Sequence, residues 1–518
     1  MDSVETRMLK TVSANNSMEA DRAKVGDLLV VLAIAAAILL LHLLTNMRHG
    51  FHRDELQFLS DALHMDWGYV AYPPLTPFVE RVSMAFFGFS PEGLRLFGVL
   101  AQATIIVAAA FIARTLGGGR LAQATTALAV ALAPLALIEG TEIQYTTFEQ
   151  FAWVLATYGA VRLLQSEEER WWLWIAAFTG LGLMAKYTVV FFLAALLAGF
   201  LLTPARRYLA SRWFVLGCGV TLLIVLPNLL WQVHHSFISL QFLQNIHARD
   251  VRNGRGSALE FWYFQAFICQ NPFSLPLTIA GVVAAWRSVR YRALSIAFVL
   301  IIVFFAVTKG RGYYTGALYP AMIAFGAVAI TRWASSSRVA LRRGVFIVLW
   351  TGLLGCGAFA ACILVPIASS GALRAFALSQ NENLREEQGW DTFVQTIAQV
   401  RDGLAPAERE SFAVVTTNYG EQGAVEMFGR KYGLTAPIGT TNSAWLRGYP
   451  TPPPTTLIVT GLDSDEVNAA FTACRPGVHV PYPAHLNNEE SKYSPDIFVC
   501  GPPRLPWPEF WKRYQHFG

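Results

Sequence analysis

The chain has 518 residues, of which 54% are hydrophobic and only 14% are charged. Soluble proteins carry about 25% charged residues, so this composition excludes an ordinary soluble domain and indicates many membrane-spanning segments. The formal net charge is +5, but no basic tract with interleaved aromatic residues occurs, which argues against a nucleic-acid partner.

Apolar runs of about 17–25 residues, long enough to cross a hydrocarbon core as a helix, recur through the first 370 residues. Residues 1–26 are polar and are expected to form a cytoplasmic N-terminal tail, and Leu28–Leu44 is interpreted as an uncleaved signal anchor. The pattern predicts a mainly α fold, a polytopic membrane helix bundle over residues 27–370 with about eleven transmembrane helices. These are expected at residues 27–45, 94–115, 120–138, 146–164, 171–185, 187–203, 212–231, 272–286, 293–308, 315–332 and 344–367.

The segment Trp171–Thr203 is long for one membrane helix and short for two. Arginine and lysine accumulate in the cytoplasmic loops of membrane proteins. With the N-terminus inside, arginines and acids alternate between the two faces along the whole chain only if this segment is a helical hairpin. That interpretation places Lys186, near the middle of the segment, at the outer surface.

The chain changes character after Pro366, and residues 371–518 are predicted to form a small α/β domain. Apolar runs of strand length alternate there with helix-like segments. The strand-length runs are Phe412–Thr416, Thr456–Thr460 and Ile497–Cys500. An odd number of spans puts this domain outside the cytoplasm, where Cys474 and Cys500 could form a disulfide; the sequence leaves their pairing open.

The loop that follows the first span contains two adjacent carboxylates, Asp54 and Glu55. Trp67, Tyr69 and Tyr72 come next, in a segment rich in aromatic residues and proline. Acids at a membrane surface are costly to desolvate, so a pair beside such a segment indicates a functional site. The ordinary alternative is that the acids are solvated and that the aromatic residues form an interfacial belt.

Further charged residues are expected on the same outer face. The charged ones are Glu139, Glu142 and Glu149 near the start of the fourth predicted span, Lys186 at the hairpin turn, and Lys309 and Arg311 before the tenth; the polar side chains of Tyr313 and Tyr314 follow directly. A carboxylate can deprotonate a hydroxyl and cations can stabilise a departing phosphate, so the set predicts group transfer from a phosphate-linked donor. The competing interpretations are solvated loop acids, lysines that extend to the interface, and a solvated His52 in place of a metal ligand.

The segment DELQFLSDALHMDWGYVAYPPLTPFVER, which starts at Asp54, resembles the first outer loop of bacterial membrane glycosyltransferases of the GT-C superfamily. It is most similar to the protein O-mannosyltransferase-like group, glycosyltransferase family 39, with its Rgt-type sugar transferases and aminoarabinose transferases. The pieces TTFEQFAW, AKYTVVFF, PNLLWQ and KGRGYYTGALYPAM resemble the same group in the same order. NYGEQGAVEMFGRKYGL is similar to the outer domain of one bacterial branch.

The resemblance implies an inverting enzyme of the bacterial inner membrane. Its expected donor is a polyprenyl-phosphate-linked sugar, and its acceptor is a lipid, a glycan or a protein at the outer face. The implied site residues fall into three groups. Asp54 is the general base, supported by Glu55, and Glu149 is a second acid with Glu142 as its competitor; Lys186, Lys309 and Arg311 face the donor phosphate; Trp67, Tyr69, Tyr72, Glu142, Tyr313 and Tyr314 line the substrate. No cofactor is certain, and a divalent cation at Asp54 and Glu55 is left open.

Two other classes compete with the enzyme. One is a transporter or a flippase for lipid-linked sugars, with Asp54, Glu149 and Lys186 as a relay; the other is a receptor or assembly subunit with structural acids. Transporters of this size often show paired halves and sites near the membrane midplane, whereas this chain gathers its charges at one face. The sugar and the acceptor are not determined by the sequence.

Overall fold

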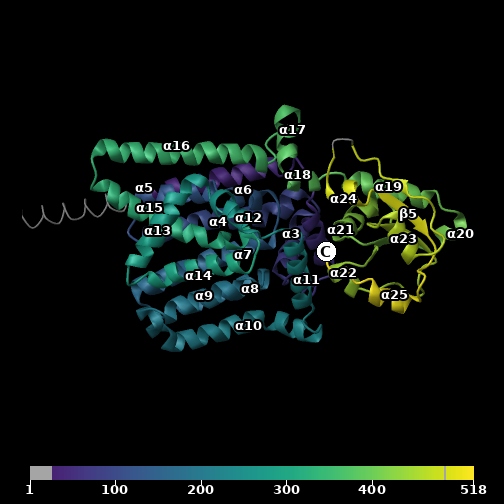
Figure 1. Ribbon diagram of the computed structural model, residues 1–518, viewed down its shortest axis with the longest axis horizontal. Helices are drawn as coiled ribbons and strands as arrows, with labels where there is room; N and C mark the ends of the chain where they lie inside the picture. The colour runs from purple at the N-terminus through teal and green to yellow at the C-terminus, as the bar shows by residue number, and fades with distance from the viewer. Residues whose placement is uncertain (1–25, 484–485) are drawn as a thin grey trace, which may run out of the picture.

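The computed structural model describes residues 26–483 and 486–518, so the tail predicted over residues 1–26 lies almost wholly outside the described residues. Within these ranges the chain is mainly helical and has two parts, a bundle of helices and a smaller α/β domain (Figure 1). The long helices of the bundle run side by side, and the α/β domain packs against one end of them (Figure 1).

The bundle begins with the helix Gly26–Thr45. It continues with α2 (Arg53–Leu63), α3 (Leu75–Phe87), α4 (Pro91–Thr115), α5 (Arg120–Ala131), α6 (Pro134–Thr141), α7 (Tyr145–Ser166), α8 (Trp171–Ala185), α9 (Val189–Leu201), η1 (Pro204–Ala210), α10 (Arg212–His234), α11 (Ile238–Arg252) and α12 (Ala258–Tyr263). The remaining elements are η2 (Phe264–Ile268), η3 (Pro272–Ser274), α13 (Leu275–Arg287), α14 (Arg292–Val307), η4 (Gly312–Leu318), α15 (Tyr319–Ser335) and α16 (Val339–Leu364).

Five helices in the described residues are long and apolar enough to cross a membrane, or up to eight if each of three bent pairs counts as one span. The bends measure 58° between α5 and α6, 113° between α9 and η1, and 85° where the helical segment ending at Ile268 meets the one that starts at Pro272. Each second segment starts at a proline, which cannot continue a preceding helix without losing a backbone hydrogen bond. The apolar helices α8 and α14 are shorter still, so the count of about eleven spans stays a prediction.

The predicted hairpin over 171–203 is present as α8 and α9. Trp172, at the start of α8, donates from Nε1 to the carbonyl oxygen of Tyr208 (3.0 Å), which lies beyond α9. Ser211 donates its hydroxyl to Glu169 (2.6 Å), just before α8. The open ends of the hairpin therefore meet, and Lys186 occupies the turn between the two helices at the opposite end.

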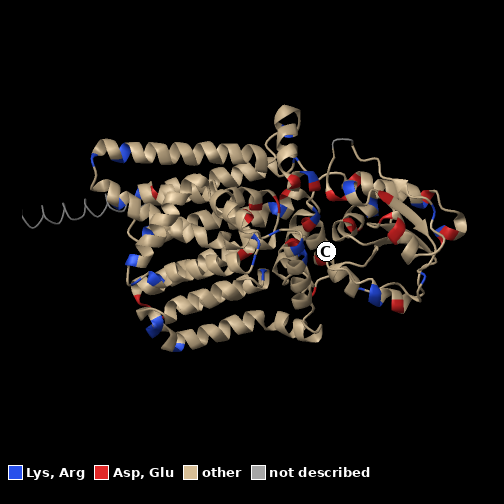
Figure 2. Cartoon of the chain, viewed as in Figure 1, with Lys and Arg blue, Asp and Glu red and all other residues tan. Residues whose placement is uncertain are grey.

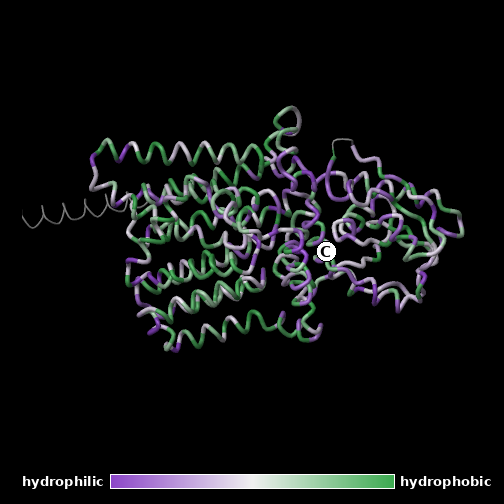
Figure 3. Tube along the Cα trace, in the orientation of Figure 1, coloured by the Kyte–Doolittle hydropathy of each residue, from purple (hydrophilic) through white to green (hydrophobic). Residues whose placement is uncertain are grey.

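Charged and hydrophobic residues are unevenly distributed along the length of the molecule. The bundle helices are largely hydrophobic, and polar residues concentrate where the bundle meets the α/β domain (Figure 3). Lys and Arg gather at the far end of the bundle, whereas the junction carries side chains of both signs (Figure 2). This asymmetry is the one on which the predicted orientation depends; the orientation itself stays a prediction.

The C-terminal part contains a mixed five-stranded sheet of order β2-β1-β3-β5-β4. Strand β1 pairs in parallel with β2 and β3, while β5 pairs antiparallel with β3 and β4. The strands are β1 (Phe412–Thr416), β2 (Ile438–Gly439), β3 (Thr456–Thr460), β4 (Val478–His479) and β5 (Asp496–Cys500). The helices are α17 (Gly371–Gln380), α18 (Glu382–Glu386), α19 (Trp390–Asp402), α20 (Pro406–Arg409), α21 (Tyr419–Phe428), η5 (Gly429–Tyr432), α22 (Asn442–Leu446), α23 (Ser464–Ala470), α24 (Glu489–Tyr493) and α25 (Trp507–Arg513). Cys474 and Cys500 are joined by a disulfide.

The α/β domain and the first loop share one apolar core. Phe51, Leu56 and Leu59 of the loop pack with Trp390 and the sheet of the domain. Helix α21 crosses α2 so closely that a Cβ atom at Gly423 would lie 2.2 Å from the carbonyl oxygen of Leu56. Only glycine permits this approach, which brings the start of α21 beside the start of α2.

Candidate active site

The two adjacent acids of the first loop open helix α2. His52 is the N-cap: its Nδ1 accepts from the backbone amide of Asp54 (3.2 Å), and Glu55 accepts from the amide of His52 (2.8 Å). This reciprocal cap satisfies two amides that lack partners within the helix, and negative charge in the first turn is favoured by the helix dipole. The pattern His-x-Asp-Glu thus has a local structural reason besides any chemical one.

Asp54 is held from two sides by distant segments. Tyr419, at the start of α21, donates its hydroxyl to Oδ1 (3.0 Å), and Gln144 donates its amide to Oδ2 (3.2 Å). Burial by itself raises the pKa of Asp54, but His52, Arg53 and these two hydrogen bonds outweigh it and hold the pKa below its usual range. The side chain keeps 32% exposure, so the structure presents an oriented carboxylate that is ionised at neutral pH.

Glu55 faces away from Asp54 into a buried network. Arg95 donates from Nε to Oε1 (2.8 Å) and from Nη2 to Oε2 (2.6 Å), and the amides of Ile143 (2.9 Å) and His52 (2.8 Å) complete its four acceptor positions. Both side chains of the pair are 1% exposed. Glu55 therefore fastens the loop to α4 and leaves no free oxygen for an ion.

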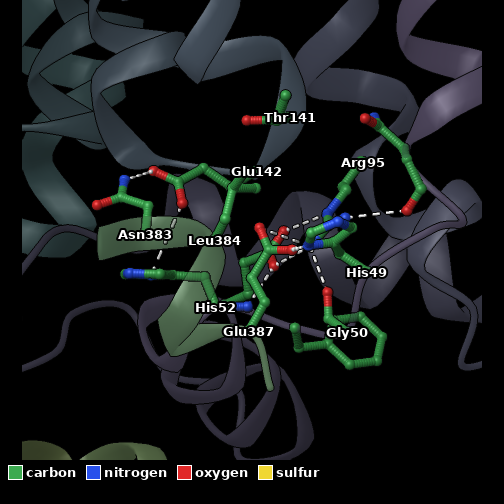
Figure 4. A network of polar contacts seen from close by, with 12 residues as sticks. His49, Gly50, His52, Arg95, Thr141, Glu142, Asn383, Leu384 and Glu387 are labelled. Carbon is green, nitrogen blue, oxygen red and sulfur yellow. Dashed lines mark hydrogen bonds and ion pairs between the residues drawn. The ribbon is translucent and has the colours of Figure 1, made fainter. Parts of the chain in front are cut away.

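Arg95 is the centre of this network (Figure 4). Besides Glu55, it donates to the carbonyl oxygens of Asn46 (3.0 Å) and Gly50 (2.7 Å) and lies 3.7 Å from Glu387. One guanidinium thus joins α4, the end of the first helix and the segment that follows α18. Buried charges of this kind need such partners, because each unpaired one would cost several kcal/mol.

Glu142 stands beside the Asp54 site, whereas Glu139 lies deeper. Glu142 accepts from the amide of Asn383 (3.0 Å) and lies 3.8 Å from His52 (Figure 4). The ring of His52 also lies 3.9 Å from Asp54. Burial raises the pKa of Glu142 to about 7. Glu139 accepts from two glutamine amides of α4 and α7 and is buried among helices.

Lys186 and Glu149 form a buried pair next to this region, with Nζ 3.4 Å from Oε2. Thr188 donates to the other oxygen of Glu149. The ammonium group lies over three tyrosine rings, at 4.9 Å from the centroid of Tyr145, 5.0 Å from Tyr313 and 4.2 Å from Tyr314. Such contacts attract a cation to the ring faces. The two predicted tyrosines therefore surround the predicted lysine.

Lys186 and the rings of Tyr145, Tyr313 and Tyr314, together called the lysine cage, adjoin Asp54 through the start of α7. Tyr145 follows directly after Gln144, the residue that binds Asp54, and its ring contacts Lys186. The structure thus joins the first loop, the start of α7, the hairpin turn and η4 into one region.

Arg311 is paired with an acid, whereas the side chain of Lys309 is exposed. Arg311 forms a two-point contact with Asp250 of α11 (2.6 and 3.1 Å) and donates to the hydroxyl of Tyr313 (3.3 Å). Its charge is therefore already balanced at the edge of the lysine cage. Lys309 has an exposed side chain on a backbone with a φ of 55°, and its backbone packs against Gly256.

The aromatic residues of the first loop divide into one exposed and two buried side chains. Trp67 is 60% exposed, whereas Tyr69 and Tyr72 are each 2% exposed. Tyr72 donates to the carboxylate of Asp61 (2.6 Å) and Tyr69 to its backbone oxygen (3.1 Å). The two tyrosines hold the loop in shape. Their role in lining the substrate stays a prediction.

Several residues of this region were not singled out in the sequence. Tyr419, Gln144, Arg95 and Asp250 touch the predicted acids and cations. Arg95 carried a signal, because an arginine in an apolar helix requires a partner. The other three are ordinary polar residues at the start of α21, at the N-cap of α7 and within α11, and only their contacts mark them.

A metal ion at Asp54 and Glu55 does not fit this arrangement, because the oxygens of Glu55 are occupied by four donors. In residues 26–483 and 486–518, no group of three or more His, Cys, Asp or Glu side chains is placed to hold a metal ion.

The family model and the curated relative that match this chain are both named as sugar transferases. The model of the dolichyl-phosphate-mannose-protein mannosyltransferase family matches residues 71–231. The lipid A galacturonosyltransferase RgtD of Rhizobium johnstonii is 27% identical over 248 residues, which cover 47% of this chain and 50% of that protein. The match thus spans half the length of this relative.

Solved structures match over nearly the whole chain. ArnT from Cupriavidus metallidurans in the apo state has a TM-score of 0.56 at 15% identity and covers 92% of this chain and 98% of its own. The same protein bound to undecaprenyl phosphate gives 0.55 at 15% identity, with 91% and 97% covered. The arabinofuranosyltransferase AftD from Mycobacteria gives 0.52 at 13% identity, covering 91% of this chain and 39% of AftD. These structures show that the chain shares the fold of ArnT and AftD. The family model and RgtD agree with the resemblance seen in the sequence.

Proposed function

We propose that the protein is an inverting glycosyltransferase that moves a sugar from a polyprenyl-phosphate donor to an acceptor at the outer membrane face. The observation that carries this proposal is the oriented, partly exposed Asp54 carboxylate beside the lysine cage. Support comes from two relatives, one named a lipid A galacturonosyltransferase and one solved with undecaprenyl phosphate. In this proposal the α/β domain lies outside the cytoplasm and the N-terminus inside.

The proposed reaction is a single displacement. The acceptor hydroxyl gives its proton to Asp54 as its oxygen attacks the anomeric carbon, and the bond from that carbon to the phosphate oxygen breaks. The electron pair of this bond leaves with the polyprenyl phosphate. Because the pKa of Asp54 lies below its usual range, the carboxylate is ionised before the reaction and gains its proton only as the acceptor becomes acidic.

We assign Lys186 to the donor phosphate. Its positive charge is balanced in this structure by Glu149 and the three tyrosine rings. A phosphate would compete with Glu149 for the ammonium group and gain charge as the sugar leaves. Arg311 would contribute less because Asp250 already neutralises it, and Lys309 would act from its exposed position in the neighbouring loop.

We assign supporting roles to the remaining acids. Glu55 positions Asp54 through the helix start and the Arg95 network. Glu142 shares His52 with Asp54, which favours it over Glu149 as the second acid near the reacting atoms. Glu149 would set the position of Lys186.

The test is sugar transfer by the purified full chain, supplied with a panel of polyprenyl-phosphate sugars and membrane acceptors. Asp54→Asn should lower the rate about 10²–10⁴-fold, the usual contribution of a general base. Glu382→Gln serves as the matched control, because Glu382 is an exposed acid at the start of α18. Undiminished transfer by Asp54→Asn would refute the base assignment, and no consumption of any donor would favour a transporter.

A further inference from the structure

A cavity of about 410 Å³ lies at the end of the bundle away from Asp54. It is lined by Phe111, Arg114 and Thr115 of α4 and by Tyr158, Arg162 and Gln165 of α7. Helix α4 starts beside the Arg95 network and runs for 25 residues, or roughly 37 Å at 1.5 Å per residue, before it reaches this cavity. The cavity is therefore separate from the proposed reaction centre, and its volume falls within the range of ligand pockets.

The charge of the cavity is one-sided. Its lining contains two arginines and no carboxylate. The nearest acids along the chain have other partners: Glu167 pairs with Arg207 (2.8 Å) and Glu168 with Arg170 (2.7 Å). Within the described residues neither Arg114 nor Arg162 forms an ion pair, so the cavity has a net positive charge that an anion would balance.

Arg162 is fixed in place before any ligand arrives. It donates from Nη1 to the hydroxyl of Tyr158 (3.0 Å), and its guanidinium lies 4.8 Å from the ring centroid of Trp171. Its Nε is buried and has no acceptor in the described part of the chain. A guanidinium held in one orientation with a donor to spare is suited to phosphate oxygens, which it can bind at two points.

The position of the cavity indicates the source of the anion. Trp171 and Trp174 lie beside it, stacked edge to face at 6.0 Å, and Trp174 is 38% exposed. Tryptophan is enriched at the level of lipid headgroups. This end of the bundle is also the one where Lys and Arg gather (Figure 2), as they do next to anionic lipids.

We propose that this cavity binds the phosphate of an anionic phospholipid headgroup, with Arg114 and Arg162 as its ligands. The bound lipid belongs to the leaflet opposite the proposed reaction centre. It therefore differs from a sugar donor, which would bind at Lys186.

The test is native mass spectrometry of the full chain in detergent, titrated with dioleoyl phosphatidylglycerol and, separately, dioleoyl phosphatidylcholine. The wild type should bind phosphatidylglycerol at least about five-fold more tightly than phosphatidylcholine. Arg114→Gln should lower the affinity for phosphatidylglycerol about five-fold, as expected for one basic residue at a headgroup. Arg287→Gln, an exposed arginine at the end of α13, should change nothing.

Three results would overturn the proposal. The first is equal retention of the two lipids, and the second is an equal loss of affinity in Arg114→Gln and Arg287→Gln. The third is displacement of the bound anionic lipid by an equimolar amount of inorganic phosphate. The last result would show a site for free phosphate. Replacing Arg162 would also remove its packing on Trp171. The decisive variant is therefore Arg114→Gln, because the side chain of Arg114 is exposed.

Discussion

Asp54 shows how a single carboxylate is prepared by residues far away in the chain. One oxygen accepts from Tyr419 and the other from Gln144. Arg53 in turn donates from Nε to the oxygen of Tyr419 (2.8 Å) and lies over its ring at 4.7 Å. The tyrosine is thereby oriented to donate to Asp54, and burial raises its pKa so that it keeps its proton.

Tyr419→Phe should move the acid limb of the pH profile of kcat/KM upward by about one unit. The reason is that a hydrogen bond to the ionised form lowers the pKa of a carboxyl, so its removal raises the pKa of Asp54. The base would then be protonated, and activity lost, at a higher pH than in the wild type. The measurement is the rate of sugar transfer between pH 4 and 9.

The control for this substitution is Tyr432→Phe. Its hydroxyl binds Asp391 in an exposed position of the same domain, so the acid limb should stay where it is in the wild type. A lower rate in Tyr419→Phe with an unshifted acid limb would contradict the positioning role and leave only a structural one.

At the scale of elements, the start of α2 depends on α4. The Glu55–Arg95 pair joins them through two hydrogen bonds in a setting where both side chains are 1% exposed. Arg95 also holds the loop between the first helix and α2, because it donates hydrogen bonds to the carbonyl oxygens of Asn46 and Gly50. The position of Asp54 is therefore set by α4, a helix long and apolar enough to cross a membrane, and not by its loop alone.

Arg95→Met should lower the free energy of unfolding by about 3–5 kcal/mol, because it leaves Glu55 buried without its cation. Denaturant titration of the purified protein measures this change. Arg287→Met, on an exposed arginine, should cost less than about 0.5 kcal/mol. A cost below about 1 kcal/mol for Arg95→Met would mean that the pair does not hold the loop.

At the scale of the whole molecule, the α/β domain is part of the site. It contributes Tyr419 and also docks through Arg447, which donates to Asp61 (2.7 Å), Ser60 (3.0 Å) and Glu426 (3.1 Å). Asp61 and Glu426 have side chains only 2% and 4% exposed. The arginine is thus a charged contact between α2 and the domain, added to their shared apolar core.

Arg447→Ala should loosen this junction, since it leaves the buried carboxylate of Asp61 without its cation and Glu426 with the His64 ring beside it. Hydrogen exchange should become faster in α2 and α21, and sugar transfer should fall because Tyr419 no longer stays at Asp54. The exposed Arg430 provides the comparison, and Arg430→Ala should leave both properties unchanged. Unaltered exchange in α2 after Arg447→Ala would show that the apolar core alone fixes the domain.

The sequence by itself determined the class of fold and which acids and cations are candidates for the site. Long apolar runs must be helices in a membrane, because the lipid offers no partner for backbone polar groups. The hairpin at Lys186 followed from charge asymmetry, and the C-terminal α/β domain followed from strand-length runs, with β1 and β3 at their expected bounds.

Only the tertiary structure decided what each polar side chain binds. Asp54 and Tyr419 are 365 positions apart, and no local pattern links residues at that distance. The same holds for the pairing of Arg311 with Asp250 and for the contacts of Tyr69 and Tyr72 with Asp61. A residue type states which hydrogen bonds a side chain can make, whereas packing of distant segments selects the ones that it makes.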